Sequence, residues 1–176
     1  MPWPSATASY ALPNHPPLLG RMIDSHIRHR SACTIAVCQV PRDMVHHYGI
    51  VVPVREEAGM SDWQLTDIIE KPRPDQTSSY LAVSARYIFG PEIFAAIRTV
   101  TPAPNGEIYL TDAISDLIQK GHMVRAVQLG ASESRADIGN HQAYFETFID
   151  YAVSDPECGP GVLNYMRGKL AKMKQK

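Results

Sequence analysis

The feature that most constrains the fold is a series of predicted strands joined by turns rather than by helices. Residues 49–54 and 64–69 are short apolar runs separated by the polar turn 55–59, and residues 80–89 form a third run. Strands that follow one another this closely pair antiparallel, because a parallel connection needs a crossover of a dozen or more residues. An earlier run at residues 33–40, which Pro41 stops, is typical of a strand buried on both faces.

Helical patterns flank these strands on both sides. Apolar residues recur at helical spacing from Leu18 to Ile27, and a short helix is predicted over residues 92–97. Thr111 is expected to cap a helix over residues 112–120, and a strand is predicted at 124–129. Asn140 is expected to cap a last helix. The predicted class is therefore α/β with an antiparallel β element.

Composition excludes several classes of protein. The 176 residues are 44% hydrophobic and 20% charged with a net charge of −1, which is typical of a globular domain and indicates no nucleic-acid or membrane partner. An odd count of three cysteines without CxxC spacing favours a reducing cytoplasm. Residues 1–11 read as an unstructured lead-in without a secretory signal. Residues 160–176 carry five cationic side chains and no acid, which predicts a solvated basic tail.

Polar residues that could bind a ligand stand at the ends of two predicted strands. Gly49 begins one strand, where a glycine lets a ligand approach the backbone, although a simple turn glycine fits as well. Glu70 and Lys71 leave the next strand together, before Pro72. A carboxylate can accept hydrogen bonds from sugar hydroxyls and an ammonium can bind a phosphate, but a surface ion pair is the alternative interpretation.

Two acidic residues further along the chain precede predicted helices. Glu107 follows a Pro/Gly-rich loop, where it could bind a ligand or could merely favour a helix N-terminus. Asp137 stands before Gly139 in the turn that leads to the last helix. It could ligate Mg²⁺, which is held by one or two protein carboxylates beside substrate phosphates, or it could be an ordinary turn aspartate.

The order of these segments resembles the sugar-nucleotidyltransferase family. The resemblance rests on Tyr-Gly-Ile-Val at 48–51, Glu-Lys-Pro at 70–72, Gly-Glu-Ile-Tyr-Leu-Thr-Asp-Ala at 106–113 and Asp-Ile-Gly-Asn at 137–140. The last two segments look like the bacterial UTP–glucose-1-phosphate uridylyltransferases. The resemblance covers residues 12–159. It implies the sugar-binding, C-terminal part of a Rossmann-like nucleotidyltransferase sheet with flanking helices, followed by a basic and helical tail at 160–176.

The resemblance also implies roles for the candidate residues. Gly49 and Glu70 would contact the hexose, Glu107 would bind its hydroxyls and Lys71 would hold the sugar phosphate. Asp137 would be one of two aspartates on the catalytic Mg²⁺. The reaction would be attack of glucose 1-phosphate on UTP, which gives UDP-glucose and pyrophosphate and depends on positioning and charge neutralisation.

The sequence departs from this family in three respects, one of which is the tail after Gly159, whose apolar residues could form an amphipathic helix. No Gly-x-Gly occurs in residues 1–100, so the loop that cradles the nucleotide triphosphate is not found. Relatives usually have glycine where Ala85 stands, and its methyl group is expected to crowd the site. The chain alone is therefore predicted to be inactive, to use UTP only if the missing half is supplied, and to self-associate or bind a partner chain through apolar faces and an unpaired strand edge. The alternative is a non-catalytic remnant that binds glucose 1-phosphate or UDP-glucose.

Overall fold

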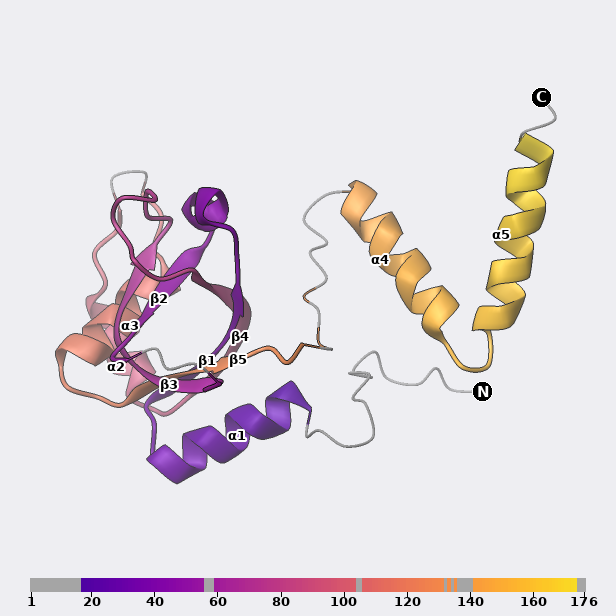
Figure 1. The fold of residues 1–176 in the computed structure, drawn as a ribbon. Coiled ribbons are helices and arrows are strands. Elements are labelled where there is room, and N and C mark those ends of the chain that lie inside the picture. Colours follow the sequence, from indigo (N-terminus) through magenta and orange to yellow (C-terminus); the bar gives the residue numbers. More distant parts are fainter. Residues whose placement is uncertain are drawn as a thin grey trace. The chain divides into compact units, whose positions relative to one another are not determined.

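Five strands close into a ring in the computed structural model of the chain, which describes residues 17–55, 59–103, 106–131, 133, 135 and 141–173 (Figure 1). Around the ring the strands follow the order β1-β4-β2-β3-β5. Their bounds agree with the predicted runs to within two residues and are β1 (Cys33–Gln39), β2 (Gly49–Pro53), β3 (Asp62–Glu70), β4 (Leu81–Phe89) and β5 (Val124–Gln128).

Five α-helices and one short 3₁₀-helix complete the described residues. They are α1 (Leu18–His29), η1 (Arg42–His47), α2 (Ile93–Thr99), α3 (Leu110–Gln119), α4 (His141–Ser154) and α5 (Gly159–Met173). The chain divides into two units between residues 134 and 135. The first unit holds the strand ring, called the barrel unit below. The second holds α4 and α5, called the helical hairpin, and α5 covers most of the predicted basic tail.

Strand pairing in the barrel unit is mixed. Antiparallel ladders join β1 to β4, β4 to β2, β2 to β3 and β3 to β5, which confirms the antiparallel element. A parallel ladder between β1 and β5 completes the ring. The expected unpaired edge is therefore wrong for the described strands, because a ladder of three residue pairs between β3 and β5 supplies each end of the sheet with a partner.

A bulge in β4 accompanies this closure. Ile35 of β1 pairs with Tyr87, whereas Val37 pairs with Val83, so β4 contains extra residues at this point. Ala85 lies in the bulge with φ of 50°, in the left-handed region. Bulges bend a strand and increase its twist, which suits a sheet that curls into a ring. The side chain of Ala85 is exposed, so its cost arises from the backbone conformation.

The hydrophobic core of the barrel unit lies on both faces of β1. Cys33, Ile35 and Val37 belong to the main cluster, together with buried residues of α2 and α3. Ala36, on the opposite face, packs with Met22 of α1. Residues 33–37 are all buried, which confirms the prediction of a strand buried on both faces.

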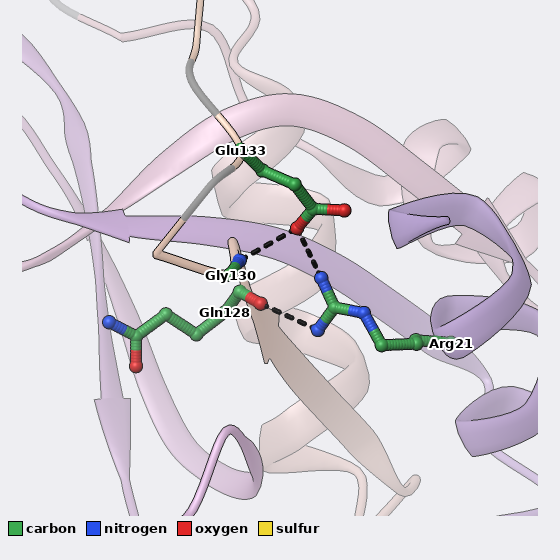
Figure 2. A network of polar contacts seen from close by, with 4 residues as sticks. All are labelled: Arg21, Gln128, Gly130 and Glu133. Carbon is green, nitrogen blue, oxygen red and sulfur yellow. Dashed lines mark hydrogen bonds and ion pairs between the residues drawn. The ribbon is translucent and has the colours of Figure 1, made fainter. Parts of the chain in front are cut away.

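A polar network anchors α1 to the chain that leaves β5 (Figure 2). The guanidinium of Arg21 donates to the main-chain carbonyl of Gln128 at 2.9 Å and pairs with the carboxylate of Glu133. The same carboxylate accepts the backbone N–H of Gly130 at 2.6 Å. Charged hydrogen bonds at a partly buried position fix the approach of the helix more precisely than apolar packing does.

The antiparallel ladder between β3 and β5 carries a second ionic contact. Arg125 of β5 lies 2.7 Å from the carboxylate of Asp62 on β3, and its side chain is only 11% exposed. The imidazole of His29, at the end of α1, approaches the other carboxylate oxygen at 4.0 Å. Three elements that are distant in sequence, α1, β3 and β5, thus meet at the three-pair ladder between β3 and β5.

The helical hairpin turns sharply between its two helices. The carboxylate of Asp155 accepts the backbone N–H groups of Glu157 and Cys158 at 2.9 and 2.7 Å, and these bonds hold the pKa of Asp155 below its usual range. A Cβ atom on Gly159 would lie 2.4 Å from the carbonyl oxygen of Val153. The corner therefore requires glycine at this position.

No helix among the described residues combines the length and the apolar character that crossing a membrane would require.

Candidate functional site

The register of β2 and β3 places the candidate segments around Gly49 and Glu70 side by side. Gly49, the first residue of β2, pairs directly with Glu70, the last residue of β3. The backbone N–H of Lys71 then donates to the carbonyl of Tyr48 at 3.0 Å, which extends the contact beyond the ladder. Two segments that are separated by about twenty residues in the sequence thus form one end of the sheet.

Gly49 is a point of close approach. A Cβ atom at this position would lie 3.0 Å from the methyl group of Thr111 and 3.2 Å from a carboxylate oxygen of Glu70. Contacts this short would force the neighbouring side chains to shift. The absence of a side chain therefore keeps Glu70 and Thr111 where they are, which is a physical reason for glycine beside this carboxylate.

The carboxylate of Glu70 has a partner at each oxygen. Thr111 donates its hydroxyl to Oε2 at 3.0 Å, and the ammonium of Lys71 lies 3.6 Å from Oε1. The side chain of Glu70 is 22% exposed and that of Lys71 is 51% exposed, so the pair borders solvent. An oriented carboxylate beside an accessible ammonium can bind a ligand that carries both hydroxyl groups and an anion.

The prediction that Thr111 caps a helix is wrong. Helix α3 begins at Leu110, the N-cap residue is Tyr109, and no side chain caps the helix. The hydroxyl of Thr111 is instead donated to Glu70, 41 residues earlier in the chain. This tertiary hydrogen bond to a charged group has taken the place of the local one.

The backbone at Lys71 is strained. Its φ of 45° lies in the left-handed region, which costs a residue with a side chain about 1–2 kcal/mol. The hydrogen bond to Tyr48 on one side and the fully buried ring of Pro72 on the other hold this conformation. Strain of this kind is common at ligand-binding sites, where the surroundings keep a side chain in a required direction.

Glu107 joins the same cluster through Tyr109. The hydroxyl of Tyr109 donates to the carboxylate of Glu107 at 2.5 Å, and the ammonium of Lys71 lies 5.4 Å from the centroid of the Tyr109 ring. The backbone positions Glu107 as well, because its carbonyl accepts the N–H of Ala103 at 2.8 Å. Gly49, Glu70, Lys71 and Glu107 therefore lie in one region, which we call the Glu70 cluster together with Tyr109 and Thr111.

Sequence reasoning missed Tyr109 and also Tyr87. Burial raises the pKa of Tyr87 to about 12, with further contributions from the Cys33 thiol and the Glu70 carboxylate. An aromatic residue two positions after Glu107 was the available signal for Tyr109, but nothing in the sequence shows which way its ring points.

Asp137, the predicted magnesium ligand, lies outside the described residues. Within the described ranges, no three His, Cys, Asp or Glu side chains gather in a way that could hold a metal ion. The Glu70 cluster by itself provides carboxylate acceptors and one ammonium. This set suits hydroxyl and phosphate groups.

Comparison with known proteins identifies relatives of this chain. The sequence profile described as nucleotidyl transferase matches residues 15–154. The UTP–glucose-1-phosphate uridylyltransferase of Streptococcus pneumoniae is 36% identical over 151 residues, which are 85% of this chain and 48% of that protein. The UTP–glucose-1-phosphate uridylyltransferase 1 of Streptococcus pyogenes serotype M1 is 36% identical over 145 residues, or 82% and 46% of the two chains.

Solved structures of UDP-glucose pyrophosphorylases are also similar to this chain. A UDP-glucose pyrophosphorylase complexed with UDP-glucose superimposes with a TM-score of 0.69 at 28% identity, over 80% of this chain and 51% of that one. The UTP-bound enzyme from Acinetobacter baumannii gives 0.69 at 28% identity, over 90% and 50%. The chain thus spans about half the length of the relatives it matches.

Proposed function

The chain belongs to the nucleotidyl transferase family and, within it, to the UTP–glucose-1-phosphate uridylyltransferases, and from this membership we propose that it binds the sugar phosphate of their reaction. Its strands would be the C-terminal part of the Rossmann-like sheet of such an enzyme. The observation that carries the proposal is the Glu70 cluster, in which Lys71 pairs with Glu70 and lies near the ring of Tyr109, whose hydroxyl is donated to Glu107.

Each member of the cluster has a role in this proposal. Lys71 neutralises the phosphate of glucose 1-phosphate, because it is a compact cation with half of its side chain in solvent. Glu70 and Glu107 accept hydrogen bonds from hexose hydroxyls. Gly49 would contact the hexose through its backbone, and its lack of a side chain keeps Glu70 and Thr111 in place. Thr111 holds the Glu70 carboxylate, since its donated hydrogen bond fixes one of the two oxygens.

The complete reaction would join this phosphate to the α-phosphorus of UTP and release pyrophosphate. Mg²⁺ would supply charge neutralisation at the phosphates, and we propose Asp137 as one of its ligands. No group of three side chains that could hold a metal ion occurs among the described residues. Transition-state stabilisation depends on all of these charges together, and the chain lacks a Gly-x-Gly loop in its first hundred residues. We therefore propose that the chain alone is inactive.

Calorimetric titration of the purified chain with glucose 1-phosphate tests the binding proposal. Lys71→Met and Glu70→Gln should each weaken binding about tenfold or more, because a hydrogen bond to a charged group contributes about 1.5–3 kcal/mol. Lys169→Met, on α5, removes an equal charge outside the cluster and should leave the affinity unchanged. A wild-type chain that does not bind, or a Lys71→Met variant that binds normally, would contradict the proposal.

Pyrophosphate release from UTP, glucose 1-phosphate and Mg²⁺ tests the proposed inactivity. We expect none from the chain alone. Release that disappears in Asp137→Ala would contradict inactivity and support Asp137 as a catalytic residue. A chain that binds glucose 1-phosphate or UDP-glucose without turnover matches the second candidate, a non-catalytic binding protein, unless a second polypeptide that supplies the nucleotide-binding half restores the reaction.

The expected self-association or binding of a partner chain remains part of the proposal. The apolar surface that supports it lies on helices rather than at a strand edge, since Leu19, Ile23 and Ile27 of α1 are 57%, 42% and 68% exposed at a spacing of one helical turn. Multi-angle light scattering that finds only a monomer over a wide concentration range would exclude self-association.

A further inference from the structure

Tyr109 contacts two of the proposed substrate-binding side chains at different parts of its own side chain. Its hydroxyl donates to Glu107 at 2.5 Å, and its ring centroid lies 5.4 Å from the ammonium of Lys71. We propose that Tyr109 is a positioning residue that sets the spacing between the phosphate-binding cation and the hydroxyl-binding carboxylate. The inference rests on the proposed function and adds a residue that the binding roles above do not use.

The backbone of Tyr109 is well suited to this role. It is the N-cap residue of α3, with an extended conformation at φ of −95° and ψ of 135°. The helix that follows is packed into the core through Ala113, Ile114 and Leu117, each of which is at most 1% exposed. The ring therefore extends from a rigid element, whereas Glu107 lies in the segment that follows the left-handed turn at Gly106.

Lys71 needs a second contact to stay available for an anion. Its flexible side chain lies 3.6 Å from the nearest oxygen of Glu70 and is half exposed, so this ion pair alone holds it weakly. The face of the Tyr109 ring attracts the same ammonium from another direction. The cation is thus shared between a carboxylate and a ring rather than held by the carboxylate alone.

The carboxylate of Glu107 also has to be oriented for a ligand. Its side chain is exposed, and ordering an exposed side chain on binding costs free energy. The hydrogen bond from Tyr109 selects one orientation before the ligand arrives. Ring and hydroxyl therefore have separable functions, because the ring acts on Lys71 and the hydroxyl acts on Glu107.

Two substitutions separate these functions. Tyr109→Phe keeps the ring and removes the hydroxyl, whereas Tyr109→Leu removes both. Calorimetric titration with glucose 1-phosphate should show a two- to fivefold loss of affinity for Tyr109→Phe and a further loss of the same size for Tyr109→Leu. Tyr165→Leu is the matched control, because Tyr165 makes the same type of contact with Lys169, at 5.5 Å, in the helical hairpin. It should leave the affinity unchanged.

Double-mutant cycles distinguish positioning from general damage. Tyr109→Phe should show coupling with Glu107→Gln and none with Lys71→Met, whereas Tyr109→Leu should couple with both. In the ligand-free chain, the NMR signals of the Lys71 side chain should be shifted by the ring current in wild type and Tyr109→Phe but not in Tyr109→Leu. Thermal melting confirms that each variant is folded.

The outcomes separate this inference from the proposed function. Wild-type binding together with equal affinity in Tyr109→Leu, or additive cycles, would overturn the role of Tyr109 and leave the proposed function intact. A wild-type chain that fails to bind glucose 1-phosphate would overturn both, even with the ring-current shift present, since Tyr109 would then be a structural residue only.

Discussion

The barrel unit and the helical hairpin are each stabilised in a different way. The barrel unit has a continuous buried cluster that includes residues from all five described strands and from α2 and α3. In the hairpin, α4 has no buried side chain and α5 buries only Gly159. Aromatic residues of α4 such as Phe145 and Phe148 are 60% and 63% exposed. Stability in this chain therefore belongs to the barrel unit, and the hairpin depends on local helix contacts.

This difference indicates which unit of the chain we expect to be stable by itself. The Glu70 cluster lies wholly within the barrel unit, on strands and a helix whose inner faces are buried. Short isolated helices are marginal in water, and most helices are stabilised by packing of an apolar face. We expect the cluster to be formed without the hairpin, whereas the hairpin needs another surface to cover its aromatic residues.

The largest expected difference comes from removing a core side chain. Leu117→Ala should lower the free energy of unfolding by about 3 kcal/mol, because the leucine is 1% exposed and leaves a cavity. Phe148→Ala, at a 63% exposed position, should change it by less than about 0.5 kcal/mol. Urea denaturation followed by fluorescence, with Trp63 buried in the barrel unit, measures both. Equal losses would show that the hairpin unfolds with the barrel unit.

The next largest expected effect is a loss of stability at alkaline pH, which should be confined to the barrel unit. Tyr87 has a pKa raised to about 12 by burial, whereas a tyrosine in the unfolded chain ionises near pH 10. The unfolded state releases its proton first, so stability that is fully present below pH 10 falls as pH rises towards 12. The free energy of unfolding should fall by about 2 kcal/mol, which is less than the full pKa shift would give because Tyr87 is partly exposed. Tyr87→Phe should lack this part of the alkaline decline in urea midpoints.

A smaller effect should be confined to the hairpin. Gly159→Ala places a methyl group against the backbone of Val153, so the corner must open at a cost of about 1–2 kcal/mol. Faster amide hydrogen exchange in α4 and α5, with unchanged exchange in β1, is the expected result. Gly161→Ala provides the control, because a Cβ atom there has no neighbour within 4 Å. Loss of protection in β1 would contradict the separation of the two units.

The smallest effect is a gain in stability. Ala85→Gly should stabilise the barrel unit by about 0.5 kcal/mol, because glycine adopts the left-handed conformation without the cost that alanine bears, less the entropy that glycine loses on folding. Thermal melting should show a small rise in Tm. Ala82→Gly, at a buried position in the same strand, should lower Tm. A decrease for Ala85→Gly would mean that the methyl group contributes a favourable contact.

The elements of the fold could be predicted because their sequence patterns are local. Runs of apolar residues ended by proline or glycine located the strands to within two residues, and Pro41 stopped β1 as expected. Closure of the ring could not be predicted, since it depends on three pairs between Asp62–Gln64 and Arg125–Val127, which are about sixty residues apart. The turn before α5, in which the carboxylate of Asp155 accepts the backbone N–H groups of Glu157 and Cys158, was not predicted.

The candidate site was predictable in its residues but not in its contacts. Gly49, Glu70, Lys71 and Glu107 were selected from motifs, and the structure brings them into one region. The partner of Thr111 could not be foreseen, because the rule for helix caps considers only neighbours in sequence and Glu70 is 41 residues away. Asp137 lies outside the described residues, so its role stays a prediction.

The parallel pairing of β1 with β5 also limits the order in which the chain can fold. Val37 pairs with Gln128, and 128 − 37 gives a separation of 91 residues. The entropy of closing so long a loop is lost before the contacts that repay it are made, so a high contact order slows folding. During synthesis the strands β1 to β4 emerge first and must wait for β5. We therefore expect completion of the ring to be the last step of barrel assembly, and the chain to be most prone to aggregation before that step.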